Sequence, residues 1–117
     1  MIFGIGIDII EVERIRSLAE KNPRFLQRIF TTKEINYCRR KANKYQHLAA
    51  RFAVKEAFFK ALGKKINWTE IGLINLASGK PRLEIRSKEK FPFEKIHVSI
   101  SHLEEYAIAM VILETSE

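Results

Sequence analysis

Residues 46–63 read QHLAARFAVKEAFFKALG, a stretch that predicts one long helix closed by a glycine. Because successive residues lie about 100° apart around a helix, apolar side chains fall on nearly every side of this one. They are Leu48, Phe52, Phe59 and Leu62 on one side, and Ala50, Val54, Ala57 and Ala61 on the other. We therefore expect this helix to be buried and the rest of the fold to pack around it.

Four charged residues interrupt this apolar helix: Arg51, Lys55, Glu56 and Lys60. A buried charge is costly unless it is paired, hydrogen-bonded or bound to a metal. One interpretation is an internal ion pair, with long aliphatic stems carrying the other charges outward. The other is a carboxylate and several cations facing a polyphosphate and its metal. Glu56 and Lys60, four residues apart, point the same way under either interpretation.

The size and charge of the chain limit its class. Its 117 residues suit one domain, 1–117, and the single cysteine, Cys38, favours a reducing cytoplasm over a disulfide-stabilised fold. The apolar N-terminus lacks a basic leader and is too short to span a bilayer. The net charge is +7, and residues 11–60 hold thirteen Lys and Arg against five Glu. We expect an acidic partner, which charge alone leaves as nucleic acid, membrane, acidic protein or phosphorylated small molecule.

Periodicity along the chain predicts an α+β fold. Residues 2–10 are Ile-rich and predict a short buried strand, and three helical patterns follow before the central helix, one of them opened by Thr31 and Glu34 at capping-box spacing. Beyond Gly63, apolar runs on either side of Ser78-Gly79-Lys80-Pro81 predict a hairpin. The alternation in KIHVSISH (95–102) and the aliphatic run of 103–114 predict two further strands.

Two carboxylates are candidates for chemistry, because Asp8 lies in an apolar strand and Glu56 lies in the buried helix. Magnesium commonly takes one or two carboxylates and completes its shell with water and phosphate oxygens. Lys60, with Arg51 or Lys55, would then neutralise phosphate charge, which favours phosphoryl transfer over proteolysis or redox chemistry. The Gly4-x-Gly6-x-Asp8 pattern lacks the third glycine of a dinucleotide-binding loop.

The histidines are ambiguous. His102 follows Ser99 and Ser101, but no Gly-x-Ser-x-Gly elbow is present, so we set a nucleophilic triad aside. His102 either bonds a ligand phosphate or ribose, or is a structural histidine, and the residues alone leave both interpretations open. For His47 and His97 the structural interpretation is favoured.

Four segments together resemble the holo-acyl-carrier-protein synthases, a small bacterial group of 4'-phosphopantetheinyl transferases. They are GIGIDIIEVERI (4–15), ARFAVKEAFFKALG (50–63), SGKP (78–81) and HVSISH (97–102). The resemblance spans nearly the whole chain. It departs at Ala50, where the family usually has glycine, and at Lys64-Lys65, where the family has a turn that is Gly-rich or contains Thr.

The resemblance implies an antiparallel sheet packed with a long buried helix and shorter helices, and an enzyme of fatty acid biosynthesis. With Mg²⁺, such enzymes transfer 4'-phosphopantetheine from coenzyme A to a serine of apo-acyl carrier protein and release adenosine 3',5'-bisphosphate. The resemblance also implies a homotrimer with active sites between subunits, without nucleic acid or membrane as partner.

The resemblance also assigns roles to residues. Asp8 and Glu56 match the metal carboxylates and, with Lys60 at the pyrophosphate, form the catalytic set. Glu56 is the candidate base. The coenzyme A set is Arg51, Lys60, Gly79, Pro81, Ser99, Ser101 and His102, and the set that binds the acidic carrier protein is Arg14, Arg24 and Arg28.

The alternative hypothesis is a basic nucleic-acid-binding module. It would use Arg39, Arg40, Lys41 and Lys44 together with Tyr37 and Tyr45. It gives Asp8 and Glu56 no purpose, and acids inside such a site would repel phosphate.

Overall fold

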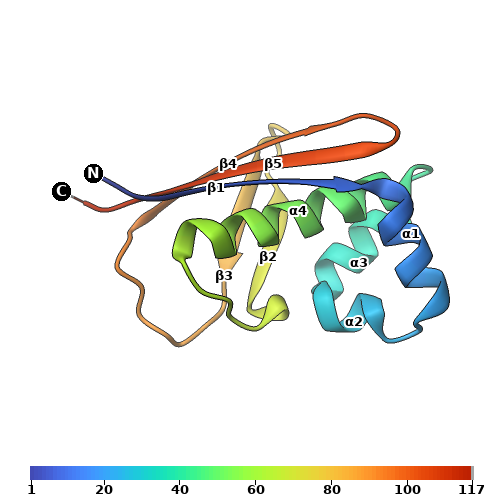
Figure 1. Cartoon of the computed structure of the whole chain (residues 1–117), viewed down its shortest axis with the longest axis horizontal. Coiled ribbons are helices and arrows are strands. Elements are labelled where there is room, and N and C mark those ends of the chain that lie inside the picture. The colour runs from blue at the N-terminus through green and yellow to red at the C-terminus, as the bar shows by residue number, and fades with distance from the viewer. Residues whose placement is uncertain (117) are drawn as a thin grey trace.

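The computed structural model of the chain describes residues 1–116. Strand β1 comes first, four helices follow, and four strands complete the chain (Figure 1). The strands are β1 (Ile2–Glu11), β2 (Ile71–Asn75), β3 (Pro81–Ile85), β4 (Lys95–His102) and β5 (Tyr106–Glu114). The helices are α1 (Val12–Lys21), α2 (Phe25–Ile29), α3 (Thr32–Arg39) and α4 (Lys44–Leu62), with a 3₁₀ turn, η1 (Trp68–Glu70), before β2. The α+β prediction is confirmed.

Helix α4 is the centre of the molecule. It runs along one face of an antiparallel sheet with strand order β1-β5-β4, while the β2-β3 hairpin forms a second, separate sheet (Figure 1). Eleven of its 19 residues are buried, as the all-round apolar pattern predicts, and it ends at Gly63 in the left-handed conformation (φ 89°) that glycine favours. The predicted hairpin is confirmed, and it stands apart from the three-stranded sheet.

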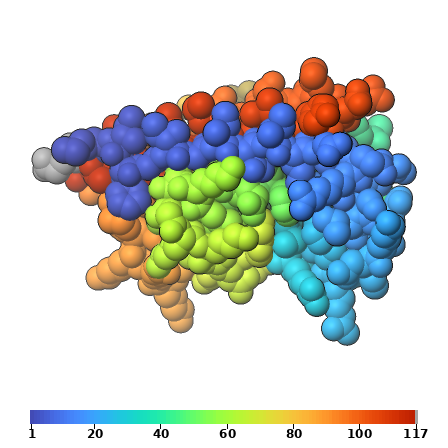
Figure 2. Space-filling view, viewed as in Figure 1, coloured from blue at the N-terminus to red at the C-terminus, as the bar shows by residue number. Residues whose placement is uncertain are grey.

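Strand β1 lies unusually close to α4, because glycine faces the helix at the points of contact. A Cβ atom on Gly6 would lie 1.8 Å from the Ala57 carbonyl oxygen, and one on Gly4 would lie 1.9 Å from that of Ala61. In the space-filling view β1 (dark blue) packs directly on α4 (green) (Figure 2). The two glycines therefore serve backbone packing, and the next residue on the same face of the strand is Asp8.

The opposite face of the same sheet is apolar and open to solvent. We call it the outer face: Ile5, Ile7 and Ile9 of β1 and Tyr106, Ile108 and Met110 of β5, all between 38% and 60% exposed. The register pairs Ile7 with Met110 and Ile9 with Ile108, so the six side chains form one continuous patch. The prediction of a strand buried on both faces is therefore wrong for the isolated chain, because only the glycine-bearing face is covered.

The three short helices gather at one end of α4, and the chain termini lie together at the other (Figure 1). Thr31 caps α3 through the predicted capping box, with Glu34 N donating to Thr31 Oγ1 and Thr31 N donating to Glu34 Oε1. None of the helices within residues 1–116 is long and apolar enough to cross a membrane.

Replacing Gly6 with alanine should destabilise the fold by about 3 kcal/mol, because the added methyl group meets helix backbone that cannot move aside. Urea unfolding measures the loss. Gly72→Ala is the matched control, since its methyl would meet the Thr31 side chain at 3.1 Å and we expect a loss of about 1 kcal/mol. Equal losses for the two variants would contradict the close-packing account.

Candidate active site

Asp8 of β1 and Lys60 of α4 form a pair at the edge of the β1–α4 contact. Lys60 Nζ lies 3.3 Å from Asp8 Oδ1 and donates to the Ile7 carbonyl oxygen at 2.9 Å. Partial burial raises the pKa of the Asp8 carboxyl, and the hydrogen bond and charge of Lys60 oppose that rise. The strand thus holds a partly desolvated carboxylate against a half-exposed cation, a direct pairing that the sequence alone did not predict.

Glu56 lies one turn before Lys60 on α4 and is partly buried. Its one recorded partner within residues 1–116 is Lys65, with Nζ 3.9 Å from Oε1. Most of the bonding capacity of the Glu56 carboxylate is therefore free for a ligand.

The donor set limits which metal would fit here. No cluster of three or more His, Cys, Asp or Glu residues able to hold a metal occurs within residues 1–116. Zinc or a fully protein-bound calcium needs such a cluster, whereas magnesium binds through one or two carboxylates and keeps water and phosphate oxygens as its other ligands. Carboxylates such as those of Asp8 and Glu56 are of the kind that magnesium takes as ligands.

A pocket of about 290 Å³ lies between α4, the β2-β3 hairpin and β4. Five residues of the predicted coenzyme A set line it: Arg51, Gly79, Pro81, Ser99 and His102. These residues come from three segments far apart in the sequence, so the fold brings them together. We call this cavity the Arg51 pocket.

Arg51 supplies the positive charge of this pocket. Its side chain is nearly buried (3% exposed), and Nη2 donates to Asn75 Oδ1 at 2.8 Å while Nη1 donates to the His47 carbonyl oxygen at 3.3 Å. The Tyr37 ring lies 4.5 Å from its guanidinium carbon. Its buried Nε has no hydrogen-bond partner within residues 1–116. A fixed cation with a donor to spare is suited to an anionic ligand.

His47 joins His102 in the pocket, with ring centroids 5.8 Å apart. Burial lowers the pKa of His47, and the nearby charges of Arg51, His102 and Lys41 lower it further. The sequence favoured a structural role for His47, and it missed Tyr37 and Asn75 as lining residues altogether. His47 lies one turn before Arg51 on α4, a spacing that could have linked the two, whereas Tyr37 and Asn75 reach Arg51 only through the tertiary fold.

The other predicted residues lie elsewhere. Lys60 lies at Asp8 and does not line the Arg51 pocket, and Ser101 lies opposite Ile108 of β5, outside the lining. Lys55, a candidate phosphate ligand, is fully buried and pairs with Glu34, so its assignment to phosphate is wrong. The partner comes from α3, so this is not an ion pair among the charges of the central helix. The carrier set (Arg14, Arg24 and Arg28) is exposed on α1, on α2 and between them.

Comparison with known proteins gives one consistent result. Residues 4–111 match the family model described as the 4'-phosphopantetheinyl transferase superfamily. The holo-[acyl-carrier-protein] synthase of Halothermothrix orenii is 45% identical, covering 97% of this chain and 98% of that protein. The corresponding protein of Oceanobacillus iheyensis is 44% identical over the full length of both chains.

Solved structures agree with these sequence relatives. A crystal structure of a holo-(acyl-carrier-protein) synthase from Bacillus anthracis, in complex with CoA (3',5'-ADP), has a TM-score of 0.85 at 38% identity and covers 99% of both chains. The Helicobacter pylori enzyme in complex with coenzyme A has a TM-score of 0.82 at 33% identity, covering 94% of this chain and 99% of that one. The predicted fold type is therefore confirmed.

The lowered pKa of His47 predicts a pH dependence of stability. Below pH about 6.5 an unfolded chain protonates His47 before the folded chain does, so the free energy of unfolding should fall as the pH drops from about 7.5 to about 5. His47→Gln should lose less stability than the wild type over this interval, as measured by urea unfolding at both pH values. An unchanged pH profile in His47→Gln would contradict the account.

Proposed function

Since this chain belongs to the 4'-phosphopantetheinyl transferase superfamily, we propose that it transfers 4'-phosphopantetheine from coenzyme A to a serine of apo-acyl carrier protein. Adenosine 3',5'-bisphosphate is then the released product, and the enzyme serves fatty acid biosynthesis in the cytoplasm. The observation that supports this proposal is the Arg51 pocket toward the start of α4 together with the Asp8–Lys60 pair, which joins β1 to the end of the helix.

The Arg51 pocket is suited to the nucleotide end of coenzyme A. Arg51, His47 and His102 supply one fixed cation and two imidazoles that can donate to phosphate, while Pro81 and Ile100 provide apolar surface beside them. Two solved relatives were crystallised with coenzyme A or its nucleotide part. We assign Gly79 and Ser99 to the same ligand as lining residues.

Asp8 and Glu56 would hold the magnesium ion, which when bound supplies positive charge to the diphosphate. The chain's own residues do the rest. Lys60 is long and half-exposed, so it can leave Asp8 and contact the phosphate oxygens, where it stabilises charge on the departing bisphosphate. Glu56, whose carboxylate makes no hydrogen bond within residues 1–116, is the base that accepts the proton of the carrier serine.

The carrier protein would dock on α1 and α2. Arg14, Arg24 and Arg28 are exposed there, and none of them forms an ion pair within residues 1–116. Unpaired surface cations steer an acidic protein without first having to break internal pairs. The basic first half of the chain therefore has a partner of opposite charge.

We assign the outer face to a second and a third copy of the chain. Contiguous apolar patches of this kind mark interfaces in proteins that are otherwise well packed. Ser99 and Ser101 lie opposite Met110 and Ile108 in the β4–β5 register, so copies seated on the outer face would approach these serines as well. This arrangement is a homotrimer with active sites between subunits, and it accounts for Ser101 lying outside the Arg51 pocket.

The direct test is mass spectrometry of apo-acyl carrier protein incubated with the purified enzyme, coenzyme A and magnesium. The carrier should gain the mass of one phosphopantetheine group, and its absence would contradict the proposed function. Glu56→Gln should lower the rate by about a hundredfold or more, because it removes the base and a metal ligand. Glu70→Gln, on η1, is the control and should keep the wild-type rate. Full turnover by Glu56→Gln with wild-type magnesium affinity would remove the assignment.

Ile7→Glu should break the proposed trimer, because it places a charge in the middle of the outer face. Size-exclusion chromatography with light scattering should find a trimer for the wild type and a monomer for the variant. Leu76→Glu is the matched control, since this exposed leucine lies in the β2-β3 turn, away from the outer face. A wild-type monomer, or an Ile7→Glu trimer, would contradict the assignment.

A further inference from the structure

The proposed mechanism leaves one charged pair unused. Lys55 of α4 and Glu34 of α3 have side chains only 1% and 0% exposed, and Lys55 Nζ lies 2.7 Å from Glu34 Oε1. Lys55 directly precedes Glu56 in the sequence, yet its side chain points into the protein while that of Glu56 stays partly exposed. A pair this deeply buried needs an account.

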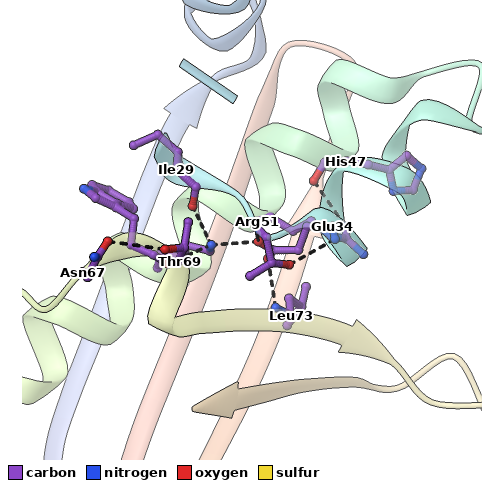
Figure 3. Close-up of polar contacts among 10 residues, drawn as sticks. Ile29, Glu34, His47, Arg51, Asn67, Thr69 and Leu73 are labelled. Carbon is purple, nitrogen blue, oxygen red and sulfur yellow. Dashed lines mark hydrogen bonds and ion pairs between the residues drawn. The ribbon is translucent and has the colours of Figure 1, made fainter. Parts of the chain in front are cut away.

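Both members of this pair also bind backbone from other segments (Figure 3). Lys55 Nζ donates to the carbonyl oxygens of Ile29 at 2.6 Å and Trp68 at 3.0 Å. Glu34 Oε1 accepts from Thr31 N and Oε2 accepts from Leu73 N, each at 2.9 Å. We call Thr31, Glu34, Lys55 and these backbone groups the buried network. It joins the end of α2, the start of α3, η1 and β2 to α4.

The ends of the buried network lie beside the proposed binding surfaces. Ile29 follows Arg28 of the carrier set, and Leu73 lines the Arg51 pocket. Between them, Lys55 is the residue next to the proposed base Glu56. One ion pair therefore links the carrier-binding helices to the helix that carries the reacting groups.

Stability alone gives a poor account of such a pair. Removing two charges from water costs about as much as their attraction returns, and apolar replacements of similar volume are often neutral or stabilising. An ion pair whose donors and acceptors all have hydrogen-bond partners holds its surroundings in one defined geometry. Here that geometry fixes α2 at a set position relative to α4.

We propose that Glu34 and Lys55 are positioning residues that hold the carrier-binding helices in register with Glu56, so that the carrier serine meets the base. This inference rests on the proposed transfer reaction. Lys55 makes the one hydrogen bond from α4 to the Ile29 carbonyl, whereas Arg51 is held separately by Asn75, Tyr37 and the His47 carbonyl. The network should therefore govern the carrier more than coenzyme A.

The test is the double variant Glu34→Gln with Lys55→Met, which leaves no uncompensated charge in the interior. In Glu34→Gln the side-chain amide oxygen can still accept a hydrogen bond from Leu73 N. In Lys55→Met the thioether has no N–H to donate to the Ile29 carbonyl oxygen. We expect kcat/KM for the carrier to fall on the order of tenfold or more, because a carrier docked on displaced helices must give up binding contacts to bring its serine to the base. The loss should therefore appear in KM for the carrier. The dissociation constant of coenzyme A, from titration calorimetry, should stay within about twofold of the wild-type value.

Two further variants keep this test decisive. Arg82→Met with Glu84→Gln removes an exposed ion pair on β3 and should change neither constant. Thr31→Val removes only the capping hydroxyl. It should raise KM for the carrier by about threefold, a smaller effect of the same sign. This variant replaces the double variant as the test if the double variant does not fold.

A folded double variant with an unchanged KM for the carrier, or with equal weakening toward both substrates, would overturn the positioning role. In the case where the double variant does not fold, an unchanged KM for the carrier in Thr31→Val would overturn it. A wild-type enzyme that fails to modify the carrier would instead contradict the proposed function, so the two failures are distinguishable.

Discussion

The cost of placing charge in an apolar interior governs α4, and the helix meets it differently at each charged position. Lys55 is paired and fully hydrogen-bonded in the core. Arg51 is stacked on Tyr37 and bonded to Asn75, and its Nε has no partner in the described part of the chain. Glu56 and Lys60 lie at the helix edge, where water or a ligand can reach them. The charge of Lys55 is thus satisfied inside the protein. Those of Arg51, Glu56 and Lys60 remain available to a ligand, to different extents.

A second constraint is the close contact of β1 with α4, which brings Asp8 of the strand to Lys60 of the helix. Without side chains at Gly4 and Gly6 the strand approaches the helix backbone directly. Asp8 follows on the same face of the strand and reaches Lys60 from it. A bulkier residue at either glycine would push the strand outward and carry Asp8 away from the helix. The glycines of the GIGID segment therefore position a carboxylate, although they contact no ligand themselves.

Much of this fold could be predicted from local pattern, because the deciding signals are local. Four predictions that depend only on short segments are confirmed. They are the all-round apolar helix, the Thr31–Glu34 capping box, the Gly63 cap and the hairpin. An ion pair among the helix charges was one of two interpretations, but the observed partner of Lys55 is Glu34 of another helix. The sequence identified Glu34 only as a capping residue, because its second contact lies 39 positions away at Leu73.

The site shows the same division between local and long-range information. Asp8, Glu56 and Lys60 stand out because acids and cations are rare in apolar segments, a signal that needs no tertiary knowledge. Tyr37 and Asn75 line the Arg51 pocket only because α3 and β2 converge there on α4. In its own segment of sequence, each of these residues fits an ordinary surface or structural role. A site built from several elements therefore cannot be predicted from one segment at a time.

The exposed face of the sheet connects assembly with activity. Along β1, residues that face α4 alternate with residues of the outer face, so Asp8 lies between Ile7 and Ile9 in the strand. A neighbouring copy that covered Ile7 and Ile9 would immobilise the strand on both sides of the carboxylate. It would also exclude water from the flank of the Asp8–Lys60 pair, where lower polarity strengthens the attraction between cation and phosphate. In the proposed trimer the interface and the reacting groups thus share one strand, which gives assembly a direct physical route to the chemistry.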